Sequence, residues 1–192
     1  RDGLDVAIRQ EGLPGDDSDE QARYLEIECG DLIIADLYLP NGNPTPGPKY
    51  EYKLAWMDRL TARAAALLET ERPVALGGDF NICPTDDDVY DPTGWAEDAL
   101  CRPESRARFR EIVNLGYADA FRLFDSRPGR YSFWDYQGGA WDRDNGVRID
   151  HFLLSPQATD RATACVIDAG PRGKPKASDH TPVMLTMEDG RG

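Results

Sequence analysis

The sequence is poor in the residues from which most metal centres and disulfide frameworks are built. Among 192 residues there are only two histidines, His151 and His180, which excludes a site made of several histidines. The four cysteines are scattered and include no C-x-x-C pair: Cys29, Cys83, Cys101 and Cys165. This spacing indicates reduced thiols in a cytoplasmic protein rather than a disulfide framework or a zinc knuckle.

Long apolar runs are also absent. No run approaches the roughly 20 residues that span a bilayer, and no signal-peptide pattern is present, so we expect no membrane association. There is no internal repeat, low-complexity segment or linker, and the length suits a single domain over residues 1–192. The chain begins with Arg1 and not with Met, from which we expect a fragment of a longer protein.

Positive charge is scarce, but only in the first half of the chain. The net charge of −13 argues against a simple electrostatic nucleic-acid binder. Residues 1–99 hold 8 Lys and Arg against 22 Asp and Glu, whereas residues 100–180 hold 13 against 11. Any contact with a polyanion is therefore expected in the second half. The acidic clusters of the first half fit either a solvated surface or attraction of a divalent cation.

The most informative stretch is residues 74–84, VALGGDFNICP. A short apolar run predicts a buried strand, and Gly77 and Gly78 let the backbone turn close to a ligand. In an extended backbone Asp79 and Asn81 leave on one face, while Phe80 points to the other and anchors in the core. A carboxylate beside an amide suits a metal-assisted hydrolase. An ordinary Asp/Asn-rich turn accounts for this stretch equally well.

Hydrophobic periodicity predicts strands alternating with a few helices. Alternation and apolar runs predict strands at residues 24–29, 32–39, 74–76, 147–154 and 183–187, and residues 131–136 are aromatic and strand-like. Helical spacing predicts a helix at 50–68 and a shorter one capped by Ser105 and ended by Gly116. Residues 11–20 and 86–102 are expected to be loops. The pattern indicates one α/β domain built on sheets.

Several predicted strands end in polar groups that hydrolysis can use. Tyr38 closes one strand, Asp150 lies on the face opposite Ile149, and His180 comes just before the last strand. A buried Asp that bonds a His fixes its tautomer and stabilises its charged form, and Asp150 with His180 could form such a pair. Taken singly, each residue also has an ordinary explanation: a packed Tyr, a structural His and a turn Asp.

Together these groups stand in sequence motifs that resemble a known family. The motifs occur in the order Tyr38-x-Pro40-Asn41-Gly42, Gly77-Gly78-Asp79-Phe80-Asn81, Tyr131-Ser132-Phe133-Trp134-Asp135-Tyr136, Arg148-Ile149-Asp150 and Ser178-Asp179-His180. Their order closely resembles the exodeoxyribonuclease III family of bacteria, within the endonuclease/exonuclease/phosphatase superfamily. The resemblance covers essentially the whole chain. It implies a four-layer α/β sandwich of two packed mixed sheets flanked by helices.

The resemblance also implies an activity and its partners. The expected enzyme is a Mg²⁺-dependent phosphodiesterase of DNA base-excision repair, with Mn²⁺ as an alternative ion. It would cleave duplex DNA at abasic sites and remove nucleotides or blocking groups from 3′ ends, leaving 3′-hydroxyl groups. By the same resemblance we expect a monomer when full length, acting in the bacterial cytoplasm on chromosomal DNA.

Site residues follow from the resemblance position by position. Asp79 matches the acid/base that activates water or protonates the leaving 3′ oxygen, and Asn81 matches the amide that orients the phosphate. His180, supported by Asp150, matches the histidine that contacts the phosphate or acts as a base, and Tyr38 matches a tyrosine beside it. The implied metal set is Asp79, Asn81, Asp179 and His180. The implied DNA contacts are Asn41 and an apolar wall for an extruded abasic sugar, formed by Phe133, Trp134, Val147 and Ile149.

One departure from the family pattern affects the metal site. The family carries, near its amino terminus, a strand that ends in a Gln-Glu pair whose Glu is the principal metal ligand. Here Gln10 and Glu11 form such a pair, but we expect them in the loop before residue 24, so the family's first strands are expected to be missing. Two alternatives stay open: a phosphatase acting on lipid or inositol phosphates, and an inert truncated fragment that binds DNA.

Overall fold

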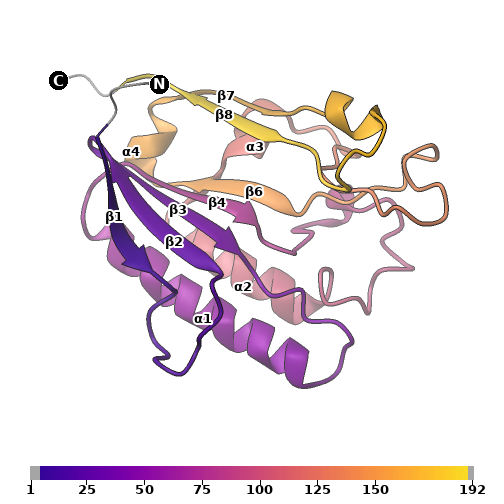
Figure 1. The fold of residues 1–192 in the computed structure, drawn as a ribbon, viewed down its shortest axis with the longest axis horizontal. Helices are drawn as coiled ribbons and strands as arrows, with labels where there is room; N and C mark the ends of the chain where they lie inside the picture. The colour runs from indigo at the N-terminus through magenta and orange to yellow at the C-terminus, as the bar shows by residue number, and fades with distance from the viewer. Residues whose placement is uncertain (1–4, 190–192) are drawn as a thin grey trace.

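The computed structural model describes residues 5–189, which form two sheets and the helices that cover them (Figure 1). The larger sheet is mixed and has the strand order β1-β2-β3-β4-β6-β5. Its β3 and β4 are parallel, and its other neighbouring strands are antiparallel. The strands are β1 (Val6–Glu11), β2 (Tyr24–Cys29), β3 (Leu32–Tyr38), β4 (Val74–Asp79), β5 (Ala118–Asp119) and β6 (Asp150–Leu154).

The smaller sheet is an antiparallel pair, β7 (Ala162–Ile167) and β8 (Val183–Met187), which lies across one face of the larger sheet. The long helix α1 (Pro48–Leu68) and α2 (Pro103–Asn114) cover the opposite face. The short helices are α3 (Ala120–Phe124) and α4 (Pro156–Thr159), with 3₁₀ turns η1 (Asp86–Asp88) and η2 (Gly170–Gly173). This α/β architecture confirms the predicted fold class, although the smaller sheet is antiparallel and not mixed in the described residues.

Two apolar layers hold the sheets and helices together. Alternate residues of β3, Ile33, Ala35 and Leu37, are buried against the apolar face of α1, where Trp56 and Met57 are also fully buried. On the other face of the larger sheet, a second cluster joins β6 and α3 to β7 and β8. The larger sheet is therefore covered on both faces, and only the ends of its strands are left to carry polar side chains of a site. No helix in the part of the chain that the structure describes is long and apolar enough to span a bilayer.

Four of the predicted elements differ from the structure. The strand predicted at 74–76 extends to Asp79, and the strand predicted at 147–154 begins only at Asp150. The aromatic residues 131–136 form no strand, because Phe133 makes only isolated bridges with Val147 and His180. Ser105 does not cap α2: Arg102 holds that position, while the Ser105 hydroxyl donates to the Ala99 carbonyl at 2.7 Å.

The stretch expected to precede residue 24 as a loop instead begins with strand β1, which ends at Glu11. Its side chains are almost all exposed, including the apolar Val6 and Ile8, so no buried face reveals the strand in the sequence. Pairing with β2 and the ion pairs of Arg9 with Glu26 and Glu28 hold it in place. The expectation of a loop around Gln10 and Glu11 was therefore wrong.

Candidate active site

Three predicted site residues form a row across the ends of neighbouring strands. In the register of the sheet, Tyr38 of β3 lies opposite Asp79 of β4, and Asp79 lies opposite Asp150 of β6. Residues directly opposite one another project on the same face of a sheet. A phenol and two carboxylates therefore lie side by side where strands β3, β4 and β6 of the larger sheet end or begin.

Asp79 and Asn81 are brought together by a tight turn and not by an extended backbone. Gly78, at φ 138°, passes so close to β3 that a Cβ there would lie 2.0 Å from the carbonyl oxygen of Leu37. Asn81 adopts the left-handed conformation, at φ 48°. Its backbone N–H donates to Asp79 Oδ1 at 2.7 Å and its Nδ2 donates to Asp79 Oδ2 at 3.0 Å. Phe80 between them is fully buried, as expected.

A second loop, which follows β3, is bonded to this turn. Asn41 Nδ2 donates to Asn81 Oδ1 at 3.0 Å, and Asn81 Nδ2 also donates to the carbonyl oxygen of Leu39 at 2.9 Å. Below both loops lies Lys53 of α1, whose Nζ donates to the carbonyl oxygens of Asn41 at 3.0 Å and Asn81 at 2.6 Å. Lys53 is completely buried, so one helix fixes the backbone of both loops.

Asp150 and His180 form the pair that the sequence suggested. His180 Nδ1 lies 3.0 Å and 3.1 Å from the two carboxylate oxygens of Asp150. The Ser132 hydroxyl donates to the same carboxylate at 2.6 Å and accepts the backbone N–H groups of Ile149 and Asp150. Because Nδ1 is held by the carboxylate, the Nε2 of His180 is left for a substrate.

The charges of this cluster shift its protonation equilibria. Burial, and next the negative charge of Asp150, raise the pKa of Asp79 to about 7. Burial of the His180 ring works against its charged form, but the hydrogen bond and charge of Asp150 outweigh it and raise the pKa of His180. Near neutral pH the cluster therefore contains a carboxyl group able to take or give a proton and a histidine biased towards its cationic form.

The remaining predicted residues lie around this cluster. Tyr38 is 53 % exposed, and the guanidinium of Arg23 stacks on its ring at 4.8 Å from the centroid. The side chain of Asp179 is half-buried, and its carboxylate lies 3.4 Å from the Ser178 hydroxyl. Its charge contributes to the raised pKa of His180. Tyr38 and Asp179 thus flank the cluster without a hydrogen bond to Asp79.

Of the four residues predicted to form an apolar wall, the structure brings two to a cavity. Phe133 packs edge-on against His180, with ring centroids 5.0 Å apart, and lines a cavity together with Val147. Trp134 and Ile149 are both only 3 % exposed and do not line this cavity. Ile149 packs in the same apolar cluster as Val147 and Phe133, whereas Trp134 belongs to another cluster. The indole N–H of Trp134 donates to Asp144 Oδ1 at 3.0 Å.

Comparison with known proteins shows the family of this chain. A model of the endonuclease/exonuclease/phosphatase family matches residues 4–180. The chain belongs to this family. The family consists of hydrolases, so the prediction of an enzyme and the predicted family are both confirmed.

Individual relatives are nucleases. The chain is 31 % identical to an exodeoxyribonuclease III of Haemophilus influenzae, covering 94 % of this chain and 72 % of the relative. It is 29 % identical to an exodeoxyribonuclease of Bacillus subtilis, covering 92 % and 68 %. Among solved structures, the 3′ phosphatase NExo from Neisseria bound to a product DNA hairpin superposes with a TM-score of 0.90 at 32 % identity, covering 96 % of this chain and 70 % of that one. An AP endonuclease from Archaeoglobus fulgidus gives 0.89 at 26 % identity, with coverages of 97 % and 80 %.

The residues described in this member of the family do not complete a metal site. Within residues 5–189 no three or more His, Cys, Asp or Glu side chains are grouped so as to hold a metal ion. The predicted set of Asp79, Asn81, Asp179 and His180 therefore stays a prediction. The Asn81 Oδ1, the amide atom that can bind a metal ion, already accepts a hydrogen bond from Asn41 Nδ2 at 3.0 Å. Mg²⁺ is usually bound through one or two carboxylates together with waters and substrate phosphates, and we assign no step to an ion.

Sequence reasoning missed four residues around the site. Ser132 orients Asp150, and Lys53 fixes the two loops. Tyr90 and Trp95 add two aromatic rings to the cavity beside Phe133. Lys53 did leave a signal, because it lies on the apolar stripe of α1 between Tyr50 and Met57, where a charge is out of place. Tyr90 and Trp95 left none, since they stand in a stretch expected to be a polar loop.

Proposed function

We propose that this protein is a DNA phosphodiesterase of base-excision repair that cleaves at abasic sites and removes nucleotides or blocking groups from the 3′ ends of duplex DNA. The observation that carries the proposal is the adjacency of Asp79, with its raised pKa, to the Asp150–His180 pair, beside an aromatic cavity. The names of relatives and structural neighbours, which include exodeoxyribonuclease III and an AP endonuclease, support DNA as the substrate. Mg²⁺, or Mn²⁺ in its place, belongs to the proposal as the ion of this enzyme class.

In the proposed reaction, water attacks the phosphorus atom and passes its proton to the carboxylate of Asp79. The bond from phosphorus to the 3′ oxygen breaks, and the 3′ oxygen takes up the proton from Asp79, which leaves a 3′-hydroxyl and a 5′-phosphate. The Nε2 of His180 donates to a phosphate oxygen, and Asp150 keeps the ring in place and stabilises its positive charge. Because the reaction returns Asp79 to its starting state, a pKa near 7 suits both proton transfers.

Other predicted residues have supporting roles in the proposal. Asn81 now donates one amide N–H to Asp79, and we assign this N–H to a phosphate oxygen when substrate is present. Tyr38, exposed at the end of β3, would contact the same phosphate, and Asn41 would contact the neighbouring DNA. Asp179 would lie near the ion. We further propose a monomer acting in the cytoplasm.

The substitution Asp79→Asn tests the proposal, because it keeps the shape of the side chain and removes its proton chemistry. Loss of a general acid/base costs roughly 10²–10⁴ in rate, and we expect such a loss in kcat on a duplex that contains one abasic site, with DNA binding largely kept. The matched control is Asp17→Asn, an exposed aspartate in the loop after β1. Cleavage by Asp79→Asn at the wild-type rate would contradict the assigned role, and a wild-type chain that hydrolyses inositol phosphates but no DNA would contradict the proposed substrate.

A further inference from the structure

A cavity of about 360 Å³ adjoins the cluster of Asp79, Asp150 and His180. Phe133 is common to both, because its ring packs against His180 and also lines the cavity. Val147 forms part of the wall and is held there by backbone bridges to Val89 and Phe133. The cavity is therefore anchored to the same segments that position His180, and a nucleotide whose phosphate lies at His180 can extend into it.

Two further aromatic rings line this cavity and expose part of their surface. Tyr90 is 40 % exposed and Trp95 is half-buried, and their ring centroids lie 6.0 Å apart at an interplanar angle of 76°. The backbone N–H of Tyr90 donates to the Gly146 carbonyl oxygen at 3.1 Å, and that of Trp95 donates to the Asp91 carbonyl oxygen at 3.1 Å. Trp95 also packs on the apolar cluster below it, so its ring is supported from one side. Supported aromatic surfaces of this kind are stacking platforms for nucleobases.

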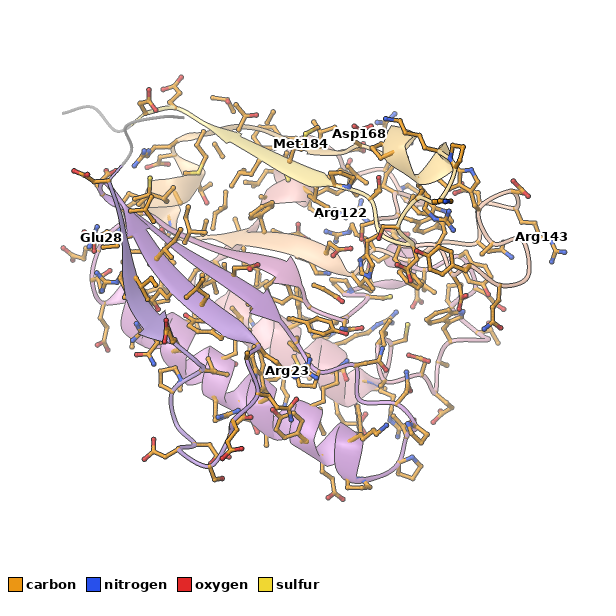
Figure 2. The ribbon with its side chains drawn as sticks, in the orientation of Figure 1. Arg23, Glu28, Arg122, Arg143, Asp168 and Met184 are labelled. Carbon is orange, nitrogen blue, oxygen red and sulfur yellow. The ribbon has the colours of Figure 1, made fainter. Side chains whose placement is uncertain are left out.

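The cavity also has polar side chains without partners. Gln137, Asn145 and Arg143 line it, and their side chains make no hydrogen bond or ion pair with any other residue between 5 and 189. Figure 2 shows Arg143 at the outer end of its loop, with its side chain directed outwards from the body of the molecule. Amide side chains of Gln and Asn form the hydrogen bonds that read the edges of bases, and an outward Arg suits a backbone phosphate.

The aromatic rings and free amides of this cavity are more than an abasic sugar needs for binding. An apolar slot is sufficient for a baseless sugar, whereas this cavity combines three aromatic side chains with two free amides. We propose that the cavity formed by Tyr90, Trp95 and Phe133 binds the nucleobase of the nucleotide whose phosphate lies at the Asp79–His180 site. It is thus a base-binding subsite for the removal of intact 3′-terminal nucleotides. This inference rests on the proposed function and adds a determinant of substrate choice to it.

The test compares a substrate that has a terminal base with one that lacks it. Duplexes ending in an ordinary 3′ nucleotide or in a 3′ phosphate are supplied to the wild type, Trp95→Ala and Trp95→Phe. Loss of one base–aromatic stacking contact corresponds to about a 5- to 100-fold effect. We expect the ratio of kcat/KM for nucleotide removal to that for phosphate removal to fall by at least fivefold in Trp95→Ala and to recover largely in Trp95→Phe. Phe124→Ala, which alters an exposed aromatic residue of α3 outside the cavity, should leave the ratio unchanged.

A second variant and a binding measurement keep the test decisive. Gln137→Ala removes an exposed side chain with no partner and should change the relative rates for the four terminal bases. Tryptophan fluorescence of wild type should be quenched more by a duplex with a terminal base than by one with a terminal abasic sugar, and this difference should vanish in Trp95→Phe. Equal losses on both substrates in folded Trp95→Ala, or identical quenching by both duplexes, would overturn the proposal. A wild type that cleaves neither substrate but shows base-dependent quenching contradicts the proposed function alone.

Discussion

At the scale of single residues, Lys53 shows how the core of this protein supports its surface chemistry. Its ammonium group lies in the interior and donates to the carbonyl oxygens of Asn41 and Asn81. Burial lowers the pKa of Lys53 to about 7, so the site is costly for a cation. Gly42 makes room for it, because a Cβ at Gly42 would lie 2.6 Å from Lys53 Cδ. The two loops that carry Asn41 and Asn81 are therefore positioned from below by one side chain.

We predict that Lys53→Met lowers kcat and leaves the KM for DNA nearly unchanged. The variant frees the two carbonyl groups and lets the Asn41 and Asn81 loops move, and displacement of catalytic groups by about 1 Å can cost on the order of 10² in rate. Two unpaired carbonyls destabilise the protein, but removing a buried charge offsets part of that loss, so the protein should stay folded. Steady-state kinetics and thermal melting make the measurement. A folded variant with wild-type kcat would show that Lys53 only fills space.

At the scale of elements, strand β6 carries a site residue on one face and a buried structural histidine on the other. Asp150 faces the site, whereas the next residue, His151, is buried between Phe80 and Phe109. The His151 Nε2 donates to the carbonyl oxygen of Ile82 at 2.9 Å, and its Nδ1 accepts from Arg148 at 3.0 Å. Burial, and next the charge of Arg148, lower the pKa of His151 to about 4. A neutral His151 therefore ties β6 to the turn after β4.

This linkage predicts a pH dependence of stability. The folded-state pKa of His151 is depressed from about 6.5, so its contribution is present above pH 6.5 and is lost as the pH falls towards 4, in total about 3 kcal/mol. Urea unfolding at several pH values should show the stability difference between wild type and His151→Gln shrinking over this window. His180 is the matched control of opposite sign: its pKa is raised, so its contribution is present at low pH and is lost as the pH rises through its folded pKa. A pH-independent difference for His151→Gln would contradict a buried neutral ring.

The elements also show what a sequence can and cannot predict here. Strong periodicity located β2, β3 and α1 to within two residues, and the motifs predicted both the closeness of Asp79 to Asn81 and the Asp150–His180 pair. The tight turn that joins Asp79 to Asn81 replaces the extended backbone that was expected there. Strand β1 was missed because it buries neither face, and β7 because a register shift between Ala162 and Ala164 interrupts its alternation. Trp95 reaches the cavity through a long loop whose path depends on tertiary contacts. Such non-local placement leaves no periodic signal.

At the scale of the whole molecule, the protein is acidic, and two carboxylates lie close together at the site where a nuclease binds its polyanionic substrate. The net charge is −13, and Asp79 lies so near Asp150 that its pKa rises to about 7. A divalent cation would relieve this repulsion, yet within residues 5–189 no three ligands are grouped to hold one. We therefore expect the cluster to attract a cation by its charge but to bind it weakly.

The last prediction is that this chain of 192 residues binds Mg²⁺ only weakly. With an incomplete ligand set, affinity should come mostly from the charge of Asp79 and Asp150, and should therefore fall steeply as the salt concentration rises. The His180 ring resonances in NMR spectra provide the readout, since a nearby cation shifts them and lowers the pKa of His180. We expect no saturation at low millimolar Mg²⁺ in wild type and a weaker response in Asp79→Asn, with Asp17→Asn behaving as wild type. Saturation at micromolar Mg²⁺ together with rapid incision of an abasic duplex would show that a full ligand set forms within these residues, and Glu11 at the end of β1 would be the first carboxylate to test.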